Sequence, residues 1–300
     1  MKQLNRSNTL PASMDLNRIV VIGAGTMGSG IAQWFAQERC QVDLVDTSKE
    51  QLEKALRSIH SSWDGLVSKG KLLAPDVERM KRDLSVRALD EVAPDCDLVI
   101  EAVIEDLKIK QDLFKQLDSK FSPHTILASN TSSFLITQLS KVLSPERKRR
   151  FVGLHFFNPA TIMKLVEVIK GKESSPDLCQ DLYAWFDQKG KKPALCKDSP
   201  GFIVNRVARN FYGEPLRIVG EDSPDRMKEV DEILKQVGGF KMGPFELMDL
   251  IGIDVNYSVT CSVWEAYQHE PRFAPHELQK KMVDEKRLGR KTKHGFYQYD

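Results

Sequence analysis

Three glycines at fixed spacing form the first candidate functional motif. Gly23, Gly25 and Gly28 follow the apolar run 19–22 and have the spacing G-x-G-x-x-G. After a buried strand, the first glycine allows a tight turn, the second lets the backbone approach a pyrophosphate, and the third lets a new helix pack on the strand. The free N–H groups at the start of that helix bind phosphate. The pattern therefore predicts a dinucleotide site.

An acidic residue at the end of the next predicted strand indicates which dinucleotide binds. Asp46 lies 18 residues after Gly28 and follows the apolar residues Val42, Leu44 and Val45. A carboxylate at this point accepts hydrogen bonds from both hydroxyls of the NAD ribose and repels the 2′-phosphate of NADP. The glycine motif alone is weak, but strand, helix, strand and acid occur here in the order it requires. We expect NAD.

A histidine and a glutamate are the candidates for proton transfer. His155 follows the apolar run 151–154, and histidine is the side chain best suited to exchange protons near neutral pH. A histidine flanked by aromatic residues is also common as a core or surface residue. Glu167 lies in the apolar strand predicted at 164–169, where a buried acid needs a partner. If this strand folds back beside His155, Glu167 can orient the imidazole; at an exposed edge it would not.

Two other polar features have both a functional and a structural interpretation. Segment 129–133, Ser-Asn-Thr-Ser-Ser, follows the apolar run 126–128, and the carboxyl ends of parallel strands face the ligand crevice of open α/β sheets. The same residues would also cap a helix well. Asn205 lies in the apolar start of a predicted helix, where its amide could donate to a substrate carbonyl or join two domains.

The elements that must position these residues alternate along the first two thirds of the chain. Apolar strands are predicted at 19–22, 42–45, 97–101, 125–128, 151–154, 164–169 and 192–196. Helices separate most of them, and those at 48–70 and 75–82 are expected to form an inserted hairpin. Ser48 and Gln51 are expected to form a capping box at its start. The alternation predicts an α/β fold with a Rossmann-type, doubly wound parallel sheet.

The pattern changes near Ser199, because only helix-length segments follow as far as about residue 288. We therefore predict a flexible N-terminal tail at 1–16, an NAD-binding Rossmann domain at 17–198 and an all-α C-terminal domain at 199–300. The C-terminal domain is expected to serve substrate binding and dimerisation.

The charge balance and the cysteines limit the partners that the sequence suggests. With 44 basic and 42 acidic residues, the net charge of +2 gives no reason to expect nucleic acid or a membrane surface. The five cysteines are odd in number and lack C-x-x-C spacing, which argues against disulfides and a metal site. There is no apolar run of ~20 residues and no secretory signal. The N-terminal segment 1–16 has some features of a transit peptide but is shorter than transit peptides usually are. We therefore expect a cytoplasmic protein.

The series of motifs closely resembles the L-3-hydroxyacyl-CoA dehydrogenase family, including bacterial 3-hydroxybutyryl-CoA dehydrogenases. The resemblance runs from residue 17 to residue 299, and its motifs are GAGTMGSGIAQ, SNTSS, GLHFFNP, KLVEVI, DSPGFIVNR, MGPFELMDL and GRKTKHGFY. It implies an oxidoreductase of fatty acid and lipid metabolism. That enzyme would use NAD to oxidise an (S)-3-hydroxyacyl-CoA thioester to the 3-ketoacyl-CoA, and it would be a homodimer.

The resemblance also implies roles for individual residues. His155 would be the catalytic base and Glu167 its orienting partner, while Ser132 and Asn205 would hold the reacting oxygen and the thioester. The positions that match cofactor contacts are Gly23, Gly25, Thr26, Met27, Gly28, Asp46, Glu105, Lys110, Ser132, Asn158 and Lys291. Ser62 and Lys69, on the inserted hairpin, match positions that touch coenzyme A.

One segment departs from the family and another suggests a subgroup. Pro215 stands where relatives have an uninterrupted helix, and a proline inside a helix removes a hydrogen bond and kinks it. This puts the local shape of the helical domain in doubt, though not the chemistry. Segments 238–256 and 271–273 most resemble members that act on 3-hydroxyadipyl-CoA.

Two other classes of protein remain as alternatives. β-Hydroxyacid dehydrogenases such as 6-phosphogluconate dehydrogenase also join a Rossmann domain to a helical one, but they use a lysine on the helix after the boundary. Here no lysine follows the boundary before Lys228. A non-catalytic NAD-binding protein, similar to the crystallin relatives of the family, would show loss of the His-Glu pair, and both residues are present.

Overall fold

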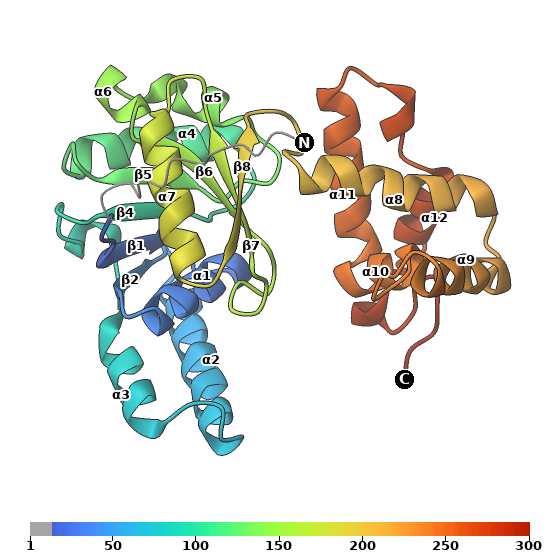
Figure 1. Ribbon diagram of the computed structural model, residues 1–300, viewed down its shortest axis with the longest axis horizontal. Coiled ribbons are helices and arrows are strands. Elements are labelled where there is room, and N and C mark those ends of the chain that lie inside the picture. Colours follow the sequence, from blue (N-terminus) through green and yellow to red (C-terminus); the bar gives the residue numbers. More distant parts are fainter. Residues whose placement is uncertain (1–13) are drawn as a thin grey trace, which may run out of the picture. The chain divides into compact units, whose positions relative to one another are not determined.

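The computed structural model describes residues 14–300, so most of the predicted tail at 1–16 lies outside the described residues. Leu16, the last residue of that segment, is buried in the core of the first unit. The chain divides into two compact units, and the boundary falls between Asp198 and Ser199 (Figure 1).

The first unit is built on an eight-stranded sheet with the order β3-β2-β1-β4-β5-β6-β7-β8. The strands are β1 Arg18–Ile22, β2 Gln41–Val45, β3 Leu84–Arg87, β4 Leu98–Glu101, β5 Ile126–Ser129, β6 Phe151–Phe156, β7 Leu165–Lys170 and β8 Lys192–Lys197. The pairs among β1 to β6 are all parallel. The predicted Rossmann-type fold is therefore confirmed.

The last two strands run opposite to the parallel strands β1 to β6, which is the fold-back of the strand at 164–169 that the sequence analysis left open. β7 pairs antiparallel with β6 and parallel with β8. The connection 157–164 between β6 and β7 contains no helix, and a parallel pair needs a crossover of about a dozen residues or more. The chain therefore turns back on itself, which reverses β7.

The sequence analysis did not predict strand β3. β3 forms the edge of the sheet beside β2, and of its four residues only Leu84 is buried. A short edge strand needs no apolar run, so its sequence has no strand signal of the kind that marks β1 or β4.

Helices cover the two faces of this sheet. They are α1 Thr26–Gln37, α2 Lys49–Ser68, α3 Ala74–Asp83, α4 Leu107–Lys120, α5 Ile136–Leu139, α6 Pro145–Lys148 and α7 Pro176–Gln188. On one face, α1 and α7 enclose an aromatic cluster in which the Trp34 ring lies 4.8 to 6.0 Å from those of Phe35, Phe156, Trp185 and Phe186. On the other face, α4 packs on β6 through aromatic rings.

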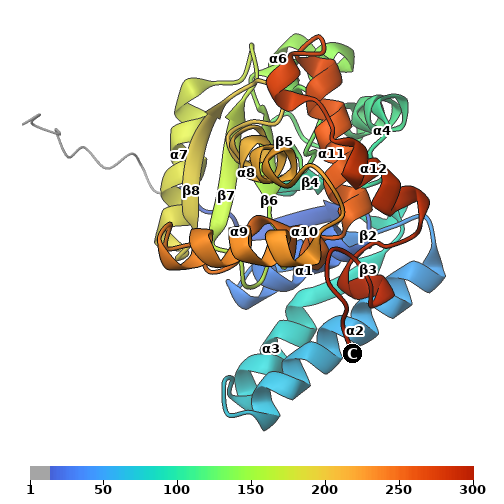
Figure 2. The same cartoon turned by 90° about the vertical axis from the view of Figure 1, so that its right-hand side faces the viewer.

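The predicted hairpin is formed by α2 and α3, which lie side by side and project from the sheet (Figures 1 and 2). Lys81 on α3 forms an ion pair with Asp64 on α2 at 2.8 Å. Only half of the expected capping box forms. The Ser48 hydroxyl accepts from the Gln51 backbone N–H at 3.2 Å, but the Gln51 amide donates to the carbonyl oxygen of Ala24 at 3.0 Å.

The second unit is helical, as predicted. Its helices are α8 Val204–Val219, α9 Pro224–Gln236, α10 Pro244–Ile251, α11 Ile253–Ala266 and α12 Glu277–Asp284. Their core contains Leu216, Met227, Phe245 and Met282. Helix α8 continues past Pro215, which is buried. Within residues 14–300, no helix is long and apolar enough to span a membrane.

Candidate active site

The turn between β1 and α1 has the backbone geometry that phosphate binding requires. Gly23 has a φ of 104°, which favours glycine, and a Cβ on Gly28 would overlap the carbonyl oxygen of Gly23. Gly25 is the N-cap of α1, and no atom lies within 4 Å of the place where its Cβ would be. The backbone at the start of α1 is thus open to an anionic ligand.

Asp46 is fixed beside this turn by the backbone. Its Oδ2 accepts a hydrogen bond from the Ala24 N–H at 2.7 Å, and its Oδ1 accepts from the Ser48 N–H at 2.9 Å. The carboxylate at the end of β2 therefore ties the glycine turn to the start of α2. Its position agrees with that of the acid in NAD-binding Rossmann folds.

A pocket of about 1290 Å³ adjoins the glycine turn. It is lined by five of the predicted cofactor residues, namely Gly23, Gly25, Thr26, Met27 and Asp46. Residues after β4, such as Val103 and Ile104, line its other side. The volume exceeds the ~300–1000 Å³ typical of a pocket for one small ligand, so it has room for a dinucleotide.

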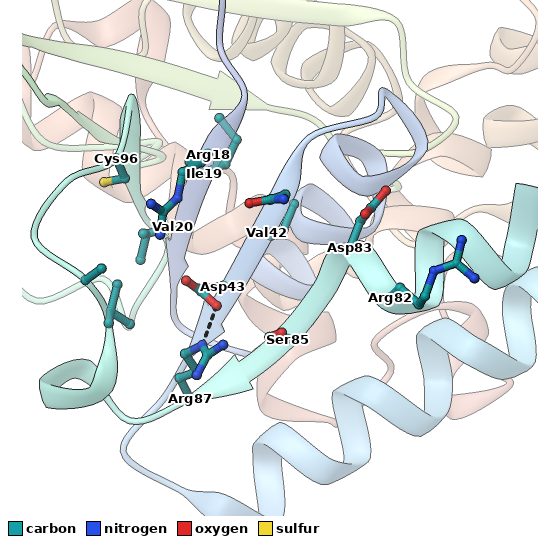
Figure 3. Close-up of a pocket in the computed structure, with 13 residues that line it drawn as sticks. Arg18, Ile19, Val20, Val42, Asp43, Arg82, Asp83, Ser85, Arg87 and Cys96 are labelled. Atoms are coloured by element: carbon teal, nitrogen blue, oxygen red, sulfur yellow. Dashed lines mark hydrogen bonds and ion pairs between the residues drawn. The ribbon is translucent and has the colours of Figure 1, made fainter.

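A second pocket, of about 250 Å³, lies against strands β1, β2 and β3 (Figure 3). It contains none of the predicted site residues and shares only Arg87 with the larger pocket. Arg87 Nε donates to Asp43 Oδ1 at 2.7 Å in the wall of this pocket. Its volume lies below the ~300 Å³ at the lower end of small-ligand pockets, so it is too small for a dinucleotide.

His155 and Glu167 are direct neighbours in the sheet. They oppose each other in the antiparallel register of β6 and β7, and side chains in such pairs lie on the same face. His155 Nδ1 lies 2.7 Å from Glu167 Oε2. Both side chains are buried, Glu167 completely. The reversal of β7 is what brings the two residues together.

The contact determines how the imidazole can exchange protons. In the tautomer with the proton on Nδ1, the imidazole donates to Glu167 Oε2. In that tautomer, Nε2 is the proton-accepting nitrogen. The centroid of the Phe157 ring lies 4.5 Å from that of the imidazole.

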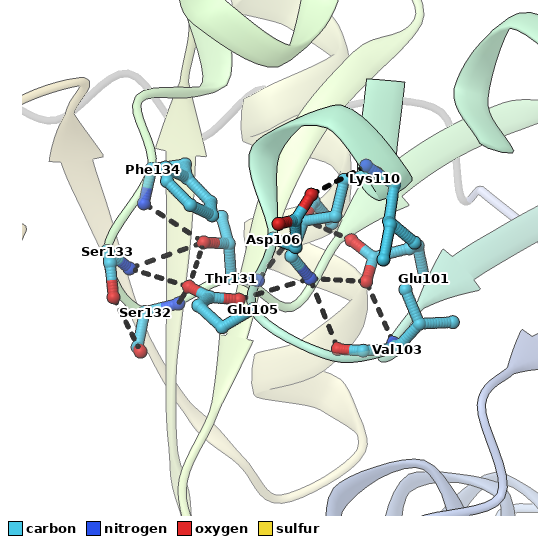
Figure 4. A network of polar contacts seen from close by, with 11 residues as sticks. Glu101, Val103, Glu105, Asp106, Lys110, Thr131, Ser132, Ser133 and Phe134 are labelled. Carbon is cyan, nitrogen blue, oxygen red and sulfur yellow. Dashed lines mark hydrogen bonds and ion pairs between the residues drawn. The ribbon is translucent and has the colours of Figure 1, made fainter. Parts of the chain in front are cut away.

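A network of charged and polar groups joins the carboxyl ends of β4 and β5 (Figure 4). The Lys110 ammonium, 1% exposed, lies 2.5 Å from Glu101 Oε1 and 3.1 Å from Glu105 Oε2. Ser129 donates its hydroxyl proton to Glu101 Oε2 at 2.6 Å. These bonds fix the start of α4 against the Ser-Asn-Thr-Ser-Ser segment.

Glu105 holds that segment directly. Its Oε1 accepts from the Thr131 hydroxyl at 2.5 Å and from the Ser132 N–H at 3.1 Å. Burial by itself would raise the pKa of Glu105, but the Lys110 charge and the hydrogen bonds from Thr131 and Ser132 outweigh it. The pKa therefore lies below the ordinary value, and Glu105 stays ionised at neutral pH.

The remaining predicted residues of the first unit lie in three places. Ser132 is in the segment after β5, and its hydroxyl lies 3.3 Å from that of Ser133. Asn158 is exposed just after β6. Ser62 accepts a hydrogen bond from Gln33 at 3.1 Å on α2, and Lys69 is exposed at the end of that helix.

Asn205 and Lys291 belong to the second unit, unlike all the other predicted site residues. Asn205 lies in the first turn of α8 and is partly buried. Lys291 Nζ contacts the carboxylate of Asp254, at 2.5 and 2.7 Å from its two oxygens.

Sequence reasoning missed Glu101, which is fully buried and contacts both Lys110 and Ser129. The sequence contained a signal for it, because an acid at the end of an otherwise apolar strand requires a buried partner. Nothing in the local sequence identified that partner as Lys110.

The glycine turn, the acid after β2 and the large pocket define a dinucleotide-binding Rossmann protein with a helical second unit. Family models identify it further. That for "3-hydroxyacyl-CoA dehydrogenase, NAD binding domain" matches residues 18–199, and that for "3-hydroxyacyl-CoA dehydrogenase, C-terminal domain" matches residues 201–299. The chain belongs to the 3-hydroxyacyl-CoA dehydrogenase family, which confirms the resemblance seen in the sequence.

Individual relatives are similar over most of this chain. It is 43% identical over 95% of its length to the 3-hydroxyadipyl-CoA dehydrogenase of Escherichia coli, of which it spans only 60%. It is 38% identical over its whole length to the mitochondrial hydroxyacyl-coenzyme A dehydrogenase of Sus scrofa and covers 97% of that protein. The crystal structure of the (S)-3-hydroxybutyryl-CoA dehydrogenase of Ralstonia eutropha is 36% identical and has a TM-score of 0.88. The match covers 95% of this chain and 100% of that one.

Proposed function

We propose that this protein oxidises (S)-3-hydroxyacyl-CoA to 3-ketoacyl-CoA with a His-Glu dyad. The supporting observation is the 2.7 Å hydrogen bond between His155 and Glu167 at the carboxyl end of β6. His155 Nε2 accepts the proton of the 3-hydroxyl group, and the imidazolium returns it in the reverse reaction. Glu167 holds the imidazole in the required tautomer and stabilises its positive charge. NAD, when bound, supplies the acceptor for the hydride from C3.

Ser132 and Asn205 complete the proposed catalytic set. The Ser132 hydroxyl donates to the reacting oxygen at C3, and the Asn205 amide donates to the thioester. Donors placed where negative charge develops stabilise the transition state. The support for Ser132 is its place at the carboxyl end of β5, where Glu105 fixes its backbone.

The cofactor site is proposed at the large pocket beside the glycine turn. Asp46 accepts from the ribose hydroxyls and selects NAD over NADP. Further contacts to the cofactor and its surroundings are assigned to Gly23, Gly25, Thr26, Met27, Gly28, Glu105, Lys110, Ser132, Asn158 and Lys291. The Lys110 ammonium already contacts two carboxylates, so it acts there mainly by orienting Glu105.

Coenzyme A is proposed to bind along α2, where Ser62 and Lys69 are exposed. A lysine at the end of a projecting hairpin attracts the anionic nucleotide. Residues 17–198 would form the NAD-binding domain, and 199–300 the substrate and dimerisation domain. The names of the relatives indicate butyryl, longer or adipyl chains as candidate acyl groups.

We further propose a cytoplasmic homodimer. Cys40, Cys96, Cys179 and Cys261 are free thiols, as is expected in a reducing compartment. The second unit exposes several apolar side chains, among them Val207 on α8, Ile233 on α9 and Val237 just after α9. Exposed apolar groups of this kind are typical of surfaces that associate.

The test is NADH oxidation followed by absorbance. Acetoacetyl-CoA, a longer 3-ketoacyl-CoA and 3-oxoadipyl-CoA serve as parallel substrates, and each assay is repeated with NADPH. We expect turnover of at least one substrate with NADH and much less with NADPH. The ranking of substrates separates butyrate, fatty-acid and aromatic-compound metabolism. A protein that binds NADH but turns over none of them would be a non-catalytic relative instead.

A further inference from the structure

The side chain of Asn130 joins the segment after β5 to the strand that carries His155. Asn130 follows β5 directly and is partly buried. Its Oδ1 accepts a hydrogen bond from the backbone N–H of Phe156, the last residue of β6, at 2.9 Å. Its own backbone N–H donates to the carbonyl oxygen of Glu101, the last residue of β4, at 2.8 Å. One residue thus contacts the carboxyl ends of β4 and β6 while it continues β5.

The contact with β6 lies where the backbone ladder of β5 and β6 ends. The paired residues of these two strands stop at Ser129 and Gly153, two residues before His155. The end of β6 therefore lies beyond this ladder, although it still pairs with β7 on its other side. Phe156 is 2% exposed, and a buried N–H that loses its acceptor is destabilising. The Asn130 amide oxygen is the acceptor that fixes this end of β6.

Asn130 also lies two positions before Ser132, in a segment that its own side chains fix. Thr131 Oγ1 accepts from the N–H groups of Ser133 at 3.2 Å and of Phe134 at 3.0 Å (Figure 4). The Thr131 residue is 1% exposed. The backbone from Asn130 to Phe134 is therefore held in one turn, so a displacement of Asn130 displaces Ser132 as well.

We propose that Asn130 is a positioning residue that sets the distance between the Ser132 hydroxyl and the His155 imidazole. The inference rests on the proposed function, in which both groups act on the oxygen at C3 of the substrate. Ser132 follows Asn130 by two residues and His155 precedes Phe156 directly, so the bond from Phe156 to Asn130 is a short link between donor and base. Such a link matters because a misplacement of about 1 Å can lower a rate about 10²-fold.

Asn130→Leu tests this role, since leucine has a similar shape but offers no acceptor to the Phe156 N–H. The substrate is the 3-ketoacyl-CoA that the wild-type protein turns over fastest, and kcat is referred to the concentration of NADH-binding sites. We expect kcat to fall by about 10- to 100-fold. The KM for the thioester and the Kd for NADH should change by less than about threefold. Asn130→Ala, which removes the acceptor without adding bulk, should give the same pattern.

Thr125→Val is the matched control, at the opposite end of the same strand. Thr125 directly precedes β5 and is fully buried, and its hydroxyl donates to the carbonyl oxygen of Cys96 at 2.7 Å. The isosteric change removes one buried hydrogen bond, so it should lower the melting temperature as Asn130→Leu does but leave kcat unchanged. An equal fall of kcat in both variants would assign a structural role to Asn130 and overturn the proposal, as would unchanged kcat in Asn130→Leu.

Hydrogen exchange separates this inference from the proposed function, because it needs no turnover. The backbone amide of Phe156 should exchange faster in Asn130→Leu than in the wild-type protein, and at the wild-type rate in Thr125→Val. Asn130→Asp keeps an acceptor oxygen and should keep this amide protected. An unchanged exchange rate in Asn130→Leu would contradict the inference even in a protein that turns over no thioester. Faster exchange without turnover of any thioester by the wild-type protein would reject the proposed function and reduce the contact to a structural one.

Discussion

At the scale of single residues, the contact between His155 and Glu167 is the centre of the proposed chemistry. His155→Gln removes the group that exchanges the proton, and Glu167→Gln removes the carboxylate that stabilises the imidazolium. We expect kcat to fall by about 10²- to 10⁴-fold in each variant. The Kd for NADH should change little, because the pocket beside the glycine turn contains neither residue.

Steady-state kinetics and NADH fluorescence titration give both quantities. Near-normal kcat in either variant would remove that residue from the mechanism. A parallel loss of NADH binding would instead indicate a disturbed fold.

At the scale of elements, the α2–α3 hairpin is expected to bind the nucleotide end of coenzyme A. Lys69→Ala removes an exposed charge at the end of α2, and exposed ion pairs contribute ~0.2–1 kcal/mol. The KM for acetoacetyl-CoA should therefore rise about two- to fivefold at low salt, with kcat unchanged. The effect should diminish as salt is added, because the interaction is screened.

Lys54→Ala, an exposed lysine on the same helix, is the control and should leave KM unchanged. A thioester of N-acetylcysteamine, which lacks the nucleotide, should show no difference between the wild-type protein and Lys69→Ala. A KM effect of Lys69→Ala on that short thioester would exclude nucleotide binding as its cause.

At the scale of the whole molecule, light scattering after size-exclusion chromatography tests the homodimer. We expect a mass about twice the 34.1 kDa of one chain. The double variant Ile233→Asp, Val237→Asp places charges on α9 and at the residue just after it, where the two side chains are 53% and 85% exposed. It should shift the mass toward that of a monomer. Wild-type protein at monomer mass would exclude the dimer at the concentration used.

The sequence by itself determined the elements and the cofactor motif, because these depend on local patterns. The apolar run before Gly23 and the acid at Asp46 predicted the dinucleotide fold, and α2 and α3 form the hairpin predicted at 48–70 and 75–82. β3 was missed, since an edge strand with one buried residue carries no apolar run.

Only the tertiary structure decided which distant residues meet. The sequence contained His155 and Glu167 but left open whether the second strand folds back, and the short connection after β6 makes it antiparallel and sets the pair in register. The contact of Lys110 with Glu101 likewise could not be predicted from the sequence around either residue. Buried charges take their partners from other elements, so the packing of those elements, and not the sequence pattern around each charge, determines the partner.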